Sequence, residues 1–83
     1  MSWAVVGFEA IDSWREREQD DETRALVLEW LIGFASGPGF ADGVPSLTQP
    51  GLFVARVPGT TTIVTFYVGI ALDPPVIAIR DIS

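Results

Sequence analysis

The last third of the chain consists of runs of β-branched and aromatic residues separated by short breaks. Residues 52–82 read LFVARVPGTTTIVTFYVGIALDPPVIAIRDI, with breaks at 58–59 (Pro-Gly) and 72–75 (Leu-Asp-Pro-Pro). β-Branched and aromatic side chains suit a pleated surface, and proline and glycine end each run. The pattern therefore predicts a three-stranded antiparallel meander. A sheet this small needs a second layer over one of its faces.

The first part of the chain shows a short apolar run followed by a helical period. Residues 2–8 (SWAVVGF) are apolar and β-branched at the centre, which predicts a strand that would extend the meander to four strands. Phe8, Ile11 and Trp14 then recur every three residues among charged neighbours. One apolar stripe on a charged background predicts a solvated helix of about three turns.

A second helix is predicted from Glu22 to Phe34. Asp20 or Asp21 precedes it and can cap its first amides, and residues 36–39 (Ser-Gly-Pro-Gly) end it. Its apolar residues form a buried face, with two more on another side: Leu26, Val27, Trp30, Leu31 and Phe34, then Leu28 and Ile32. A helix apolar over so much of its circumference lies inside a core or has a second partner.

Residues 40–51 (FADGVPSLTQPG) predict an irregular loop. A loop of this length is either functional or packed by its own apolar residues, here Phe40, Val44 and Leu47. The chain of 83 residues has room for one domain, 1–83. The expected fold class is α+β: an N-terminal strand, two helices, then the three-stranded meander, with the helices on one face of the sheet.

Alternation within the predicted strands divides the meander into two faces. The first face is apolar and suits the helices: Phe53, Ala55, Val57, Val64, Phe66, Val68, Ile77 and Ile79, with Thr62 at its margin. The second face mixes polar and apolar side chains: Arg56, Thr65, Tyr67 and Arg80 with Leu52, Val54, Ile63 and Val76. A mixture of this kind predicts a binding face. Trp3 is a candidate interface anchor, whereas Trp14 and Trp30 lie on buried stripes.

Composition narrows the chemistry available to this face. The chain contains no cysteine, histidine or lysine, which excludes thiolate and imidazole metal sites and catalysis by serine–histidine or cysteine–histidine pairs. We therefore expect no metal and no cofactor. The net charge of −6 argues against nucleic acid as a partner. No apolar run is long enough to span a membrane and no basic leader is present, so a cytoplasmic location is expected.

The proportion of apolar residues exceeds what a small core can hide. Apolar residues make up 48% of the chain and the mean hydropathy is +0.35. A domain of this size buries only about 60–65% of its unfolded surface. The excess predicts an interface with a protein partner or with a second copy, and so a homo- or hetero-oligomer.

Three segments resemble the RelE/ParE toxin superfamily of bacterial toxin–antitoxin systems. SWAVVGFEAIDSWRER is similar to its opening strand and first helix, RALVLEWLIGFASGPG to its second helix, and LFVARVPGTTTIVTFYV with VIAIRDI to its final strands. The resemblance implies the strand–helix–helix–meander order and capture by an antitoxin. RelE-type members cut messenger RNA with a cluster of basic residues, whereas ParE-like members inhibit DNA gyrase by binding it.

The chain departs from the RelE pattern in its basic residues. The middle-strand arginine position falls at Thr62 or Ile63, and only Arg56 and Arg80 remain of the basic set. The resemblance therefore implies a toxin-family protein that acts by protein–protein binding: target inhibition, neutralised by an antitoxin. Its binding residues would be Trp3, Leu52, Val54, Arg56, Ile63, Thr65, Tyr67 and Arg80.

Two alternative functions remain open from the sequence. One is a non-toxic, self-associating accessory module with the same fold. The other is a weak ribosome-dependent endoribonuclease that uses Arg56, Arg80 and Tyr67 as catalytic residues. Phosphate chemistry needs positive charge where the transition state gathers negative charge. Two arginines on an acidic chain supply little of it.

Overall fold

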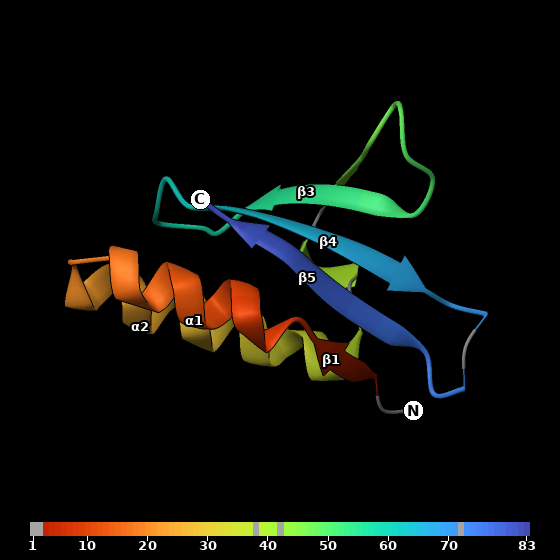
Figure 1. The fold of residues 1–83 in the computed structure, drawn as a ribbon, viewed down its shortest axis with the longest axis horizontal. Coiled ribbons are helices and arrows are strands. Elements are labelled where there is room, and N and C mark those ends of the chain that lie inside the picture. The colour runs from red at the N-terminus through yellow and green to blue at the C-terminus, as the bar shows by residue number, and fades with distance from the viewer. Residues whose placement is uncertain (1–2, 38, 42, 72) are drawn as a thin grey trace.

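A computed structural model describes residues 3–37, 39–41, 43–71 and 73–83. Two helices cover one face of a five-stranded mixed sheet (Figure 1). Helix α1 spans Phe8–Arg17 and α2 spans Asp21–Ile32, continued by a 3-10 turn over Gly33–Ser36. The strands are β1 (Ala4–Val6), β2 (Val44–Pro45), β3 (Leu52–Arg56), β4 (Ile63–Gly69) and β5 (Val76–Ile82), and a second 3-10 turn covers Gly39–Ala41.

The strand order β1-β5-β4-β3-β2 contains the predicted meander as its centre. Strands β3, β4 and β5 pair antiparallel, as the sequence pattern predicts, and β1 joins as a further strand parallel to β5. The prediction of an irregular loop over 40–51 is wrong in part, because β2 pairs antiparallel with β3, with Val44 opposite Val54. The sheet therefore has five strands, and its predicted count of three or four is corrected.

The connection from β1 to α1 requires a glycine. Gly7 has a φ of 101°, and a Cβ at this position would overlap the carbonyl oxygen of Ile79 on β5. The first strand ends before Gly7, and Phe8 begins α1 rather than ending the predicted strand. The close approach to Ile79 lets α1 start directly beside β5.

The core lies between the helices and the apolar face of the meander, as the alternation predicts. The sheet side of the core consists of seven buried residues: Ala55, Val57, Val64, Phe66, Ile77, Ile79 and Ile82. The helical segment packs four buried residues against them: Trp14, Val27, Leu31 and Phe34. Phe66 is central, because its ring lies 4.9 Å from that of Phe34 and 5.8 Å from that of Phe53. Trp30 is partly buried and meets Phe34 edge to face at 4.9 Å.

Several predicted core residues are exposed instead. Phe8 is 66% exposed. It is the first residue of α1, and the side of α1 that packs against the core carries Ala10 and Ile11 instead. Leu26 is 37% exposed at the margin of α2 near Gly59, where the predicted buried face ends. Packing of the 40–51 loop by Val44 and Leu47 is also wrong, since both side chains are exposed. The side chain of Phe40, predicted to pack the same loop, lies outside those described.

One arginine connects the helices to the sheet, and another connects the two helices to each other. Arg17, at the end of α1, donates from Nη2 to the carbonyl oxygen of Ile82 on β5 at 2.8 Å. Arg24 donates from Nε to the carbonyl oxygen of Glu18 at 2.7 Å and so closes the turn between the helices. No helix in the described part of the chain is long and apolar enough to cross a membrane.

Asp20 caps α2, as predicted. Its Oδ2 accepts from the hydroxyl of Thr23 at 2.5 Å and from the backbone N–H of Thr23 at 3.1 Å. These hydrogen bonds hold the pKa of Asp20 below its ordinary value of 3.8, and the bond from the Thr23 hydroxyl has the largest effect. The cap satisfies a donor that the first turn of a helix otherwise leaves without a partner.

Gly7→Ala is expected to lower the free energy of unfolding by roughly 3 kcal/mol, from backbone strain and overlap with the backbone of Ile79. Gly39→Ala is the matched control, because a Cβ there meets nothing within 4 Å. Its effect should stay within about 0.5 kcal/mol. Urea unfolding followed by circular dichroism measures both. Equal effects of the two substitutions would contradict the constraint at Gly7.

Asp20→Asn keeps an acceptor at the cap but removes its charge. Because the pKa of Asp20 is lowered in the folded state, its stabilising effect is complete above 3.8 and is lost as the pH falls through the folded-state pKa. We expect a higher urea midpoint for the wild type at neutral pH, with the gap closing on acidification below 3.8. Glu29→Gln removes a charge from the middle of α2 as the control, and an identical gap would contradict the capping role.

Candidate functional site

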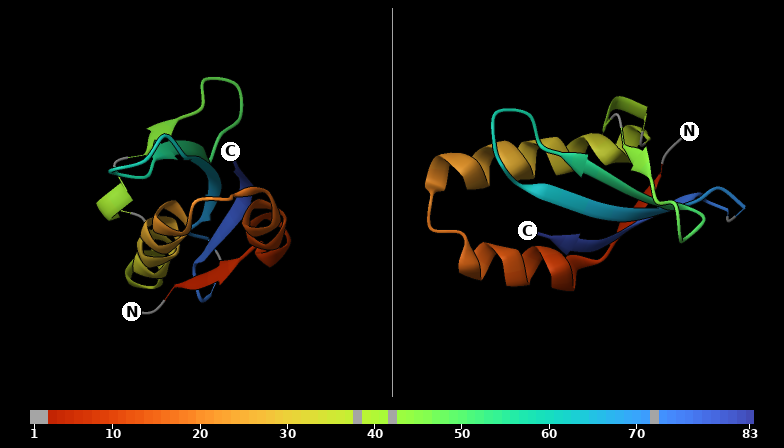
Figure 2. Two further views of the ribbon diagram at one scale, coloured as in Figure 1. Left: turned by 90° about the vertical axis from the view of Figure 1, so that its left-hand side faces the viewer. Right: turned by 90° about the horizontal axis from the view of Figure 1, so that it is seen from above.

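The face of the sheet turned away from the helices carries seven of the eight predicted binding residues. Register places Leu52 opposite Tyr67, Val54 opposite Thr65 and Arg56 opposite Ile63. We call this surface the open face; it consists of Leu52, Val54, Arg56, Ile63, Thr65, Tyr67 and Arg80 with Ala4, Val6, Val44, Val76 and Ala78. Both helices lie on the opposite side (Figures 1 and 2).

Trp3, the eighth predicted residue, lies elsewhere. Its backbone N–H donates to the carbonyl oxygen of Ala35 at 3.2 Å. Its indole lies against Gly37, where an added Cβ would come within 3.0 Å of Nε1. Trp3 is partly buried against the core, on the helix side of the sheet. The structure therefore does not bring it together with the other seven residues.

A β-bulge in β5 places Asp81 on the open face next to Arg80. Phe66 stands opposite Ile79 and Thr65 opposite Asp81, which leaves Arg80 as the additional residue between them. Its guanidinium carbon lies 5.2 Å from the centroid of the Tyr67 ring, in cation–π geometry. The hydroxyl of Tyr67 donates to Oε1 of Gln49 at 3.3 Å. Arg80, Tyr67 and the loop before β3 thus form one connected polar group.

Neither arginine of the open face forms an ion pair with a carboxylate among the described residues. Within the described ranges the structure holds a single ion pair, Arg24 with Asp21 at 3.3 Å on α2. Arg56 is exposed at the end of β3, and Arg80 contacts the ring of Tyr67. Their strands lie on either side of β4, which puts the two Cα atoms about 12 Å apart. The pair therefore supplies two separate positive charges and does not form one site in which both arginines bind the same anion.

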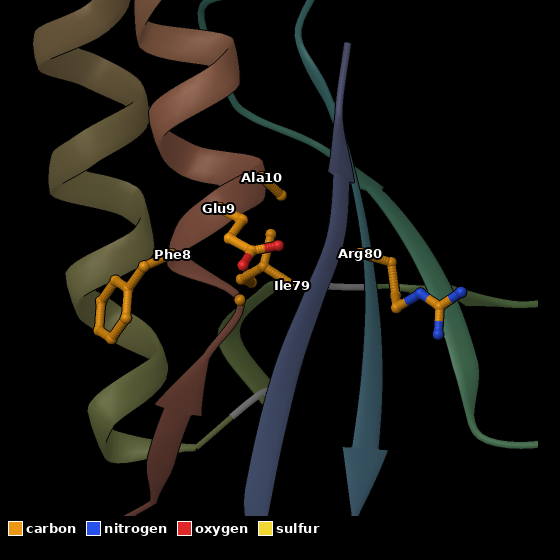
Figure 3. A pocket seen from close by; sticks show the side chains of 6 residues that line it. Phe8, Glu9, Ala10, Ile79 and Arg80 are labelled. Atoms are coloured by element: carbon orange, nitrogen blue, oxygen red, sulfur yellow. The ribbon is translucent and has the colours of Figure 1, made fainter.

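Two hollows in the described part of the surface contain no catalytic constellation. The first, about 510 Å³, lies where α1 begins against β5 and is lined by Gly7, Phe8, Glu9, Ala10, Ile79 and Arg80. In Figure 3 Glu9 lies beside Ile79, whereas the guanidinium of Arg80 extends away on the other side of β5. Another, about 360 Å³, is largely apolar and lies between α2 and the β3–β4 turn. No group of residues that could hold a metal ion occurs in the parts of the chain described.

Sequence reasoning missed the contribution of the two edge strands to the open face. Ala4 and Val6 reach it because β1 pairs with β5, opposite Val76 and Ala78, and Val44 reaches it through β2. Val6 and Val44 are both exposed. Alternation within residues 4–6 was a usable signal, but it assigns a face only after the pairing partner is known.

A double-mutant cycle with Arg80→Ala and Tyr67→Leu should give a coupling energy of about 0.5–1 kcal/mol, the range of exposed cation–π pairs. Arg56→Ala combined with Tyr67→Leu is the control, because Arg56 stands opposite Ile63 at the far end of β4. That pair should be additive. Chemical unfolding of the four proteins in each cycle provides the energies, and equal coupling in both cycles would contradict a specific Arg80–Tyr67 contact.

Comparison with known proteins does not assign this face. No protein-family model matches the chain, and neither curated proteins nor solved structures give a significant match.

Proposed function

We propose that this chain is a RelE/ParE-like toxin-family protein that acts by binding a protein partner through its open face. The observation that supports this proposal most directly is the composition of the open face. It combines exposed apolar side chains, such as Val54 and Val44, with two arginines that form no ion pair within the described part of the chain. Apolar contact area beside arginine and tyrosine is typical of the energetically dominant part of protein interfaces.

The order of elements supports the family part of the proposal. The chain runs through a strand, two helices and an antiparallel meander, the order that the resemblance implies, with the short strand β2 as an addition before the meander. The β1–β5 pairing places the first and last elements side by side, with the helices across the other face. The open face is then the broad surface on which an inhibited target, or a neutralising antitoxin segment, would lie.

Charge distribution favours a protein partner over RNA. Eight of the eleven acidic residues lie in the helical part of the chain: Glu9, Asp12, Glu16, Glu18, Asp20, Asp21, Glu22 and Glu29. The open face has only Arg56 and Arg80 as cations, with Asp81 next to Arg80. Such a surface holds too little positive charge to follow a phosphate backbone. It suits a partner segment that combines apolar side chains with carboxylates.

Inducible expression in a bacterial host tests the proposal. We expect wild-type expression to arrest growth, and Val54→Asp to restore colony counts by at least tenfold, because a charge in the middle of a buried interface is desolvated without a partner. Ile32→Asp is the matched control: it puts the same charge at an exposed apolar position on α2, 74% exposed, and should leave the arrest intact.

Two other outcomes would contradict the proposal. Normal growth on wild-type expression would exclude a toxin and favour the accessory module. Cleavage of ribosome-bound message that disappears with Arg56→Ala would instead support the endoribonuclease.

A further inference from the structure

We propose that the free protein is a homodimer in which the open faces of two copies pack against each other around a two-fold axis. The inference rests on the proposed function in one respect only, that the open face is a protein interface. It adds that, when no other partner is present, a second copy of this chain occupies the open face.

The extent of the open face is compatible with a dimer interface. Five strands spaced about 4.8 Å apart, each rising about 3.3 Å per residue, make a face about 20 Å by 20 Å. Its flat projection is about 400 Å², and two copies remove at least twice that area from water. The rest of the roughly 1,200 Å² at which specific interfaces begin would have to come from side-chain relief and from the loops beside the face.

The loop between β2 and β3 adds to the contact. It rises from the sheet on the side away from the helices, in both Figure 1 and Figure 2. Gln49, in this loop, accepts from the hydroxyl of Tyr67, so the loop is tied to the open face. Leu47, in the same loop, is fully exposed at 103%. A second copy on the open face would meet Leu47 and remove it from water.

The edges of the sheet offer much less than its face. Strand β1 has three residues and β2 has two, of which Pro45 has no N–H to donate. Pairing along either edge would therefore form few inter-strand hydrogen bonds. Association through the face is the alternative that uses the exposed apolar area.

The bulge gives the open face a self-complementary pair of charges. Arg80 and Asp81 are consecutive and exposed; Arg80 stacks over Tyr67, and Asp81 stands opposite Thr65 on the same face. Neither forms an ion pair within the described chain. A two-fold axis near these residues would bring each arginine to the aspartate of the other copy, so one contact is made twice.

A charge-swap experiment tests this arrangement. Arg80→Asp leaves two adjacent carboxylates on the open face, and Asp81→Arg leaves two adjacent arginines. Each variant alone is expected to raise the dimer dissociation constant at least tenfold, because like charges then meet across the axis. An equimolar mixture of the two variants should recover a dimer, now a heterodimer. Sedimentation equilibrium of each variant and of the mixture measures all three constants.

Matched controls separate the interface from a change in net charge. Arg15→Asp and Glu22→Arg make the same charge changes on exposed helical positions and should leave the wild-type dissociation constant unchanged. Val54→Asp should weaken the dimer at least tenfold, whereas Ile32→Asp should not. Circular dichroism verifies that every variant is folded.

A monomeric wild type over the whole concentration range would overturn the inference. So would a dimer that Val54→Asp and both charge swaps leave intact, since the copies would then meet elsewhere. A monomer that still arrests growth would leave the proposed function standing, because colony counts and molecular mass are independent measurements. A dimer without growth arrest would support this inference and contradict the toxin.

Discussion

The parallel pairing of β1 with β5 is the contact on which the rest of the molecule depends. Parallel neighbours cannot be joined by a tight turn, and here nearly the whole chain lies between the two strands. Gly7 makes the pairing compatible with an immediate helix, because its missing side chain lets α1 begin against the backbone of Ile79. Arg17 then attaches the end of α1 to Ile82 at the end of β5. Both ends of α1 are thus held to the same strand.

This arrangement covers one side of the sheet and leaves the other bare. The two helices fill the space over the apolar face, with Phe34 and Phe66 in contact at its centre. Among the described residues, no further helix or strand lies over the second face. The exposed apolar residues and the two arginines of this surface make it the part of the described structure that is suited to a partner.

The bulge between Thr65 and Phe66 determines the chemistry of that surface. In a regular strand Arg80 and Asp81 would point to opposite faces, and the aspartate would enter the core. The additional residue instead keeps both on the open face and lets Ile82 return to the interior, where it is fully buried. One irregularity in one strand thus places an adjacent pair of opposite charges on the open face.

The sequence by itself determined the meander, the two helices, a capping aspartate before the second helix and the separation of the meander strands into two faces. These follow from local periodicity and from proline, glycine and capping residues, which act over a few positions. The direction of β1, the fifth strand, the exposure of Phe8 and Leu47, and the position of Trp3 against Gly37 were decided only by the tertiary structure. Each depends on which distant segment lies alongside, and hydrophobicity patterns within one segment carry no information about that choice.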